Sequence, residues 1–156
     1  MPQQEGYARR TLGTDNVFTW HPPSPYVEFG LASCFSFLRA ASDACDLTAT
    51  ANVLGYDCLG IADRNTLAGV VRIHTEAAKA CVSPLIGTRL VLLCGTELLA
   101  YPQDRDAYAR LSTLLSKGKM QTADGVWQDK GETHLTLEML RDYAQGLHLI
   151  VMPTEN

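Results

Sequence analysis

The chain alternates short runs of β-forming residues with longer helical segments, and this alternation limits its fold more than any other feature. In the first half, strands are predicted over 26–31, 58–62 and 84–87, and helices over 43–54 and 69–80. Ser42 is the predicted N-cap of the first helix, and Gly55 is the residue predicted to end it. Strands separated by helices in this way are typical of an α/β domain with a mainly parallel sheet.

The second half adds a hairpin and two more helices. The predicted elements are a β-hairpin over 90–94 and 97–101, helices over 104–116 and 136–144, and a strand over 147–152. Asp104 and Thr136 are the predicted N-caps of the two helices. Residues 117–133 form a predicted polar loop. Residues 1–25 end in His21-Pro22-Pro23-Ser24-Pro25 and lack apolar periodicity, so we predict a flexible leader followed by one domain over 26–156.

Charge and hydropathy exclude several classes of protein. The formal net charge is −4, from 13 Lys and Arg against 17 Asp and Glu, whereas a free-standing nucleic-acid-binding protein usually carries a basic surface. No apolar run approaches the roughly 20 residues that a membrane span needs, and the first residues do not resemble a signal peptide. The sequence therefore predicts a cytoplasmic protein with no membrane partner.

Three arginines follow predicted strands, and we name Arg39, Arg64 and Arg89 the arginine rim. Functional groups in parallel α/β folds collect at the carboxyl ends of the strands, so these side chains are expected at one edge, with Asp63 as the acid beside them. Guanidinium groups bind phosphate in a bidentate manner, but each arginine could equally be paired with a carboxylate or solvated. No nucleophile, histidine pair or glycine-rich phosphate loop has the spacing of a known site, so no catalytic residue is predicted.

Several segments together resemble a known family. They are residues 26–42, 54–72, 85–90, 99–111 and 131–140, in an order that covers most of 26–152. These segments resemble the PHP (polymerase and histidinol phosphatase) domain, and more narrowly the N-terminus of the error-prone bacterial DNA polymerases, which are damage-inducible relatives of the DNA polymerase III alpha subunit. The resemblance implies a PHP-type (β/α)7 barrel, of which this chain would form about half, with mainly parallel strands and one hairpin.

The resemblance also identifies positions at which PHP domains bind divalent metals. The family's motifs are H-x-H followed by an acid, then D-H, then an acid after an Ile-Gly pair. The matching positions in this chain are Gly30, Ala32, Arg39, Asp63, Arg64 and Arg89. Only Asp63 could bind a cation, because a guanidinium has no lone pair to donate. We therefore expect a degenerate site with no metal and no other cofactor, in which the arginine rim replaces the metal charge and holds Asp63 in a salt-bridge network.

Three functions remain open at this point. In the first, the chain is the N-terminal PHP segment of a polymerase, a nucleotidyltransferase that copies damaged DNA and takes part in repair, and this segment is a non-catalytic scaffold. Its partners would be the rest of the polymerase, DNA only through that polymerase, and by resemblance a sliding clamp and other mutagenic-repair proteins. In the second it is a stand-alone metal-dependent phosphoesterase, against which the lost ligands count. In the third it binds phosphate or nucleic acid with the arginine rim.

Overall fold

The described part of the chain folds around one five-stranded sheet. The computed structural model describes residues 26–120, 128–129 and 131–153, so the predicted leader lies outside the described residues. Along the chain the elements are β1 (Glu28–Leu31), α1 (Ala44–Val53), β2 (Cys58–Arg64), α2 (Val70–Lys79), β3 (Ser83–Val91), β4 (Glu97–Pro102), α3 (Arg105–Gly118), α4 (Leu137–Tyr143) and β5 (Leu147–Val151). The α/β class and the predicted hairpin are confirmed.

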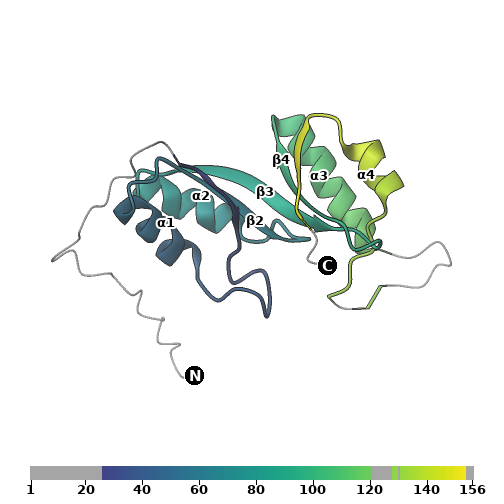
Figure 1. Ribbon diagram of the computed structural model, residues 1–156, viewed down its shortest axis with the longest axis horizontal. Coiled ribbons are helices and arrows are strands. Elements are labelled where there is room, and N and C mark those ends of the chain that lie inside the picture. Colours follow the sequence, from purple (N-terminus) through teal and green to yellow (C-terminus); the bar gives the residue numbers. More distant parts are fainter. Residues whose placement is uncertain (1–25, 121–127, 130, 154–156) are drawn as a thin grey trace, which may run out of the picture.

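The sheet has the order β1–β2–β3–β4–β5 and is mixed. The β1–β2 and β2–β3 pairings are parallel, whereas β4 runs antiparallel to both of its neighbours, β3 and β5. In Figure 1, α1 and α2 lie beside the parallel strands, and α3 and α4 lie beside β4 and β5. The long strand β3 therefore belongs to both halves of the molecule.

The course of β3 differs from the prediction of two short strands, over 84–87 and 90–94. One nine-residue strand runs through Thr88 and Arg89, and its earlier part pairs with β2 while its later part pairs with β4. The polar pair looked like a break, but the Thr88 hydroxyl donates to the carbonyl oxygen of Asp63 at 2.7 Å. Arg89 faces another strand, as described below, so both polar residues have partners inside the sheet.

The helix ends agree with the sequence except at one cap. Asp104 and Thr136 cap α3 and α4, and Gly55 follows α1 with φ +72°, a conformation that favours glycine. The cap of α1 is Asp43 rather than the predicted Ser42, because the Asp43 carboxylate accepts from the backbone N–H groups of the next turn.

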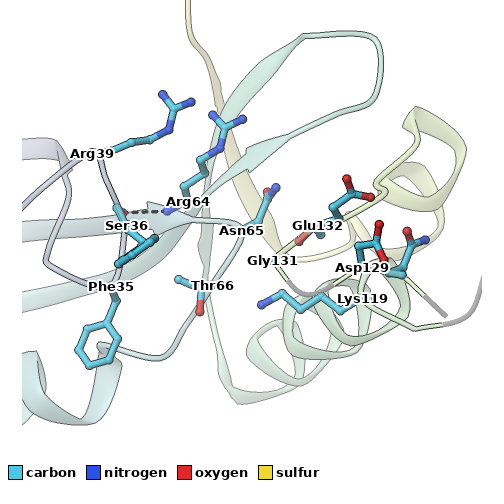
Figure 2. A pocket seen from close by; sticks show the side chains of 13 residues that line it. Phe35, Ser36, Arg39, Arg64, Asn65, Thr66, Lys119, Asp129, Gly131 and Glu132 are labelled. Atoms are coloured by element: carbon cyan, nitrogen blue, oxygen red, sulfur yellow. Dashed lines mark hydrogen bonds between the residues drawn. The ribbon is translucent and has the colours of Figure 1, made fainter.

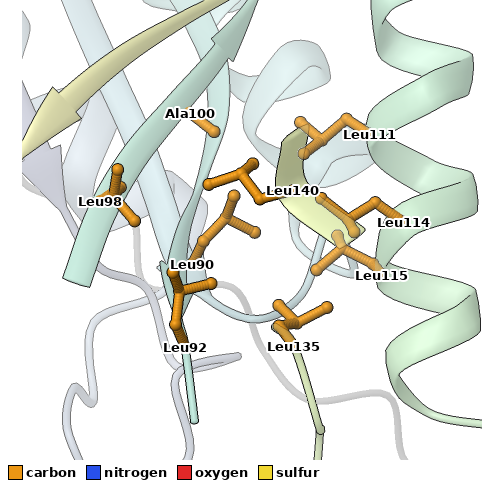
Figure 3. Packing of buried hydrophobic residues seen from close by; sticks show 9 residues of the cluster. All are labelled: Leu90, Leu92, Leu98, Ala100, Leu111, Leu114, Leu115, Leu135 and Leu140. Carbon is orange, nitrogen blue, oxygen red and sulfur yellow. The ribbon is translucent and has the colours of Figure 1, made fainter. Parts of the chain in front are cut away.

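All four described helices cover one face of the sheet. A leucine-rich cluster joins α3 and α4 to β3 and β4 (Figure 3): Leu90, Leu92, Leu98, Ala100, Leu111, Leu114, Leu115, Leu135 and Leu140. A second cluster joins α1 and α2 to β2: Ala44, Ala51, Leu59, Ile61, Ile73 and Val82. Ala62, Leu99 and Tyr101 form a smaller cluster on the opposite face, as the inner side of an open barrel requires. None of the described helices is long and apolar enough to cross a membrane.

Candidate functional site

Asp63 lies near the carboxyl end of β2 and is almost completely buried, with 2% of its surface exposed. Its Oδ1 atom accepts from the Ser33 N–H at 2.7 Å and from the Ser36 hydroxyl at 2.6 Å, and its Oδ2 atom accepts from the Ser33 hydroxyl at 2.7 Å. All three donors come from the loop that follows β1. The carboxylate therefore fastens this loop to the end of β2.

Arg64 and Arg89 lie on the other face of the sheet, next to each other in the parallel register of β2 and β3. Both form ion pairs with Glu97, the first residue of β4. Arg64 Nη1 lies 3.1 Å from Glu97 Oε1, and Arg89 Nη1 lies 3.5 Å from Glu97 Oε2. The three side chains are about a third exposed, so each pair contributes roughly 0–1 kcal/mol to stability.

The expected salt-bridge network between the arginine rim and Asp63 is wrong. Successive residues of a strand point to opposite faces, so Asp63 and Arg64 cannot project to the same side of β2. The acid of the network is Glu97, which the sequence reasoning did not single out. The predicted hairpin over 90–94 and 97–101 left Arg89 outside it, so its register gave no signal for this contact. In the structure Leu99 pairs with Arg89, which makes Glu97 a diagonal neighbour of Arg89 on the same face.

The arginine rim does not converge as one group. Arg39 is exposed in the loop after β1 and forms no ion pair with any of the described residues. Arg39 and Arg64 line one cavity of about 530 Å³, but Arg89 does not reach it. Figure 2 shows the two guanidinium groups projecting in the same direction, with Arg64 between Arg39 and Asn65.

Gly30 and Ala32 bring no ligand atom to this edge. A Cβ atom at Gly30 would lie 3.5 Å from Glu28 Oε1 and 3.8 Å from Arg89 Nη2, so this position faces the side of the sheet on which Arg89 lies. Across the described ranges, no group of three or more His, Cys, Asp and Glu side chains is placed to hold a metal ion. The polar groups brought together here are an ion-paired cluster of two arginines and one glutamate.

The fold and the position of the site place this chain among α/β-barrel proteins whose functional residues lie at the strand ends. Comparison with known proteins identifies the family. The family profile described as "PHP domain" matches residues 30–154, so the chain belongs to the PHP domain family. This finding confirms the resemblance identified from the sequence.

The relatives are more specific. The chain is 47% identical over 133 residues to an error-prone DNA polymerase of Rhodopseudomonas palustris (strain BisB5), in a match that covers 82% of this chain and 11% of the relative. It is 44% identical over 133 residues to an error-prone DNA polymerase of Caulobacter vibrioides, covering 84% of this chain and 12% of the relative. The chain thus spans little more than a tenth of the length of these curated relatives.

A solved structure supports the barrel. A protein of Bifidobacterium adolescentis, assigned as a metal-dependent phosphoesterase, superposes with a TM-score of 0.51 at 20% identity, over 63% of this chain and 34% of that protein. At this identity the likeness shows the fold alone. Together with the family match it confirms the predicted partial PHP-type barrel.

Proposed function

We propose that this chain is the N-terminal segment, over 26–156, of the PHP domain of an error-prone DNA polymerase, and that the segment is a non-catalytic scaffold. The names of the relatives and the small share of their length that the chain matches support the first part. One observation carries the second part: at the positions where PHP domains are expected to bind metal, Glu97 bridges Arg64 and Arg89.

The side chains present do not fit a cluster of divalent metals. Such a cluster needs several carboxylate or imidazole donors within one site. Here two of the matching positions are Gly30 and Ala32, which have no donor atom, and three are guanidinium groups, which repel a cation. Asp63 keeps a carboxylate, but its oxygens face the Ser33–Ser36 loop on the opposite side of β2. The site is therefore degenerate, and the arginines supply positive charge in place of a metal.

A scaffold role predicts that the open edge of the barrel is covered by another part of the polymerase. Leu149, Ile150 and Val151 of β5 are exposed, and β5 pairs with β4 on one side only among the described strands. The remainder of the polymerase would cover this edge. DNA, a sliding clamp and other mutagenic-repair proteins would then be reached through the whole polymerase, in the cytoplasm, during replication past damage and repair.

Metal binding tests the scaffold role. Isothermal titration of the chain with Zn²⁺ and Mn²⁺, together with an assay for hydrolysis of a phosphomonoester, should show neither stoichiometric binding nor metal-dependent turnover. The double variant Gly30→His, Ala32→His restores an H-x-H pair and is the positive control for weak binding. A tightly held metal in the unaltered chain, with metal-dependent hydrolysis, would instead support the stand-alone phosphoesterase.

The coding sequence tests the polymerase assignment separately. Genomic sequence downstream of codon 156 should continue in frame with coding for a polymerase of the kind named above. A stop codon at that point in the source genome would refute this part of the proposal, whatever the metal titration shows.

Phosphate binding by the arginine rim is a second candidate, with one observation in its favour. Arg39 and Arg64 line the same cavity, although Arg89 does not. A phosphate site at this place is compatible with a scaffold role for the rest of the segment.

A further inference from the structure

The cavity beside the end of β2 gathers hydrogen-bond donors from three separate elements. Arg39 lies in the loop after β1, and Arg64 and Asn65 lie at the end of β2. Lys119 is the residue that caps the C-terminus of α3. Arg64 donates from Nη1 to Glu97, and a guanidinium has five N–H donors, so other donors of Arg64 remain available to a ligand. The cavity of about 530 Å³ is within the usual size of small-molecule sites.

Asn65 is the most informative of these residues. It is only 9% exposed and has φ +48°, a left-handed conformation that asparagine tolerates better than most residues. Its Oδ1 atom accepts from the Val91 N–H at 2.9 Å, which fixes the orientation of the amide. The Nδ2 group is therefore the end of the amide that faces the cavity, and none of the described residues accepts a hydrogen bond from it. No buried side-chain nitrogen or oxygen atom in the described ranges lacks a partner, so this amide group is open to the cavity and can donate to a ligand there.

The opposite charge lies on the other side of the cavity. Asp129 and Glu132 line that side, and Figure 2 shows them beyond Asn65 from Arg39 and Arg64. Phe37 also lines the cavity and is 81% exposed, so one aromatic ring is available for stacking. Desolvation lowers the pKa of the Lys119 ammonium, although the residue as a whole is exposed, and an anion nearby would oppose this shift.

We infer that this cavity binds a mononucleotide without a metal, with the phosphate held by Arg39, Arg64 and Asn65 Nδ2. Charge-assisted bonds from guanidinium and amide donors suit a phosphate group. The carboxylates of Asp129 and Glu132 can accept from sugar hydroxyl or base amino groups at the other end of the ligand. The Phe37 ring can stack on the base. The inference rests on the second candidate function, and its failure leaves the scaffold proposal unchanged.

The test is isothermal titration calorimetry of the chain with deoxyadenosine monophosphate, in a buffer free of phosphate and sulfate. One nucleotide should bind per chain, added salt should weaken the binding, and deoxyadenosine without phosphate should bind at least tenfold more weakly, about the value of one charge-assisted hydrogen bond. Inorganic phosphate should compete, but more weakly than the nucleotide. Equal affinity for deoxyadenosine, or tighter binding of an unphosphorylated single-stranded oligonucleotide, would overturn the inference.

Two variants and one control assign the binding to this cavity. Asn65→Asp keeps the oxygen that accepts from Val91 and replaces the donor with a negative oxygen, and it should lower the affinity at least tenfold. Arg39→Met alters an exposed residue and should lower the affinity without affecting folding. Arg105→Met, at the far end of the 14-residue helix α3 and about 20 Å along it, should change nothing. Unchanged affinity in Arg39→Met and Asn65→Asp would refute the site; if Asn65→Asp does not fold, Arg39→Met decides.

Discussion

Replacing Asp63 tests what this buried carboxylate does in the fold. Asp63→Ala removes the acceptor of three hydrogen bonds and leaves the Ser33 N–H and two serine hydroxyls without it in a buried place. A hydrogen bond to a charged group contributes roughly 1.5–3 kcal/mol, and bonds that share one acceptor group are not additive. We therefore expect the free energy of unfolding to fall by about 3–5 kcal/mol.

Asp63→Asn separates hydrogen bonding from charge. The Asn carbonyl oxygen can occupy the place of Oδ1, which accepts two of the three bonds, and its amide can donate to the Ser33 hydroxyl once that hydroxyl rotates. All three contacts can thus be kept without the negative charge. The cost of Asp63→Asn should be about 1–2 kcal/mol, well below that of Asp63→Ala.

Urea unfolding followed by far-ultraviolet circular dichroism measures both variants. Asp57→Ala, at an exposed aspartate next to β2, is the matched control and should change the free energy of unfolding by less than about 0.5 kcal/mol. If Asp63→Asn lowers the free energy of unfolding as much as Asp63→Ala does, the negative charge of Asp63 stabilises the fold, and hydrogen bonding alone does not explain its role. A loss below about 1 kcal/mol for Asp63→Ala would refute the argument that Asp63 fastens the loop.

Three further predictions concern the inner face of the sheet. Gly87→Ala would place a Cβ atom 2.6 Å from the Tyr101 ring and 2.7 Å from a β4 carbonyl oxygen, so it should destabilise the chain by about 1–3 kcal/mol in urea unfolding, whereas Gly30→Ala, with no atom closer than 3.5 Å, should not. Glu97→Gln should cost roughly 0.5–1 kcal/mol at low salt, and the difference from the unaltered chain should shrink as salt is added; a difference that salt does not alter would contradict an ionic role. Burial and the nearby Glu28 carboxylate raise the pKa of the Tyr101 hydroxyl in the folded chain. The neutral Tyr101 side chain therefore stabilises the fold below about pH 10, and this stabilisation is lost at higher pH, where tyrosine ionises in the unfolded chain. Tyr101→Phe should remove this part of the alkaline loss, as shown by comparing unfolding free energies at about pH 8 and pH 11.

The local pattern of the chain predicted most of the elements because their signals are local. The Asp104 and Thr136 caps, the Gly55 ending and the hairpin all depend on a few neighbouring residues. The break expected in β3 failed for the opposite reason. Thr88 and Arg89 are polar, and their partners lie on β2 and β4, so no window along the chain could show that they belong inside a strand.

The same division holds at the candidate site. From the sequence, the donor atoms at the six matching positions could be counted, and the chemistry of glycine, alanine and arginine already argued against a metal cluster. The direction in which each side chain points could not be read in the same way. Asp63 and Arg64 are adjacent in the chain, yet they serve opposite faces of β2 and have entirely different partners.

By itself, the sequence determined the α/β class, the family and the residue types at the six positions that the resemblance identified, since each of these depends on residue type and on order along the chain. Tertiary structure alone decided that Glu97 forms ion pairs with two arginines, that Asp63 holds a loop, and that Asn65 shares a cavity with Arg39. These facts depend on strand register and on side-chain direction, and both are set by pairing between segments that lie far apart in the chain.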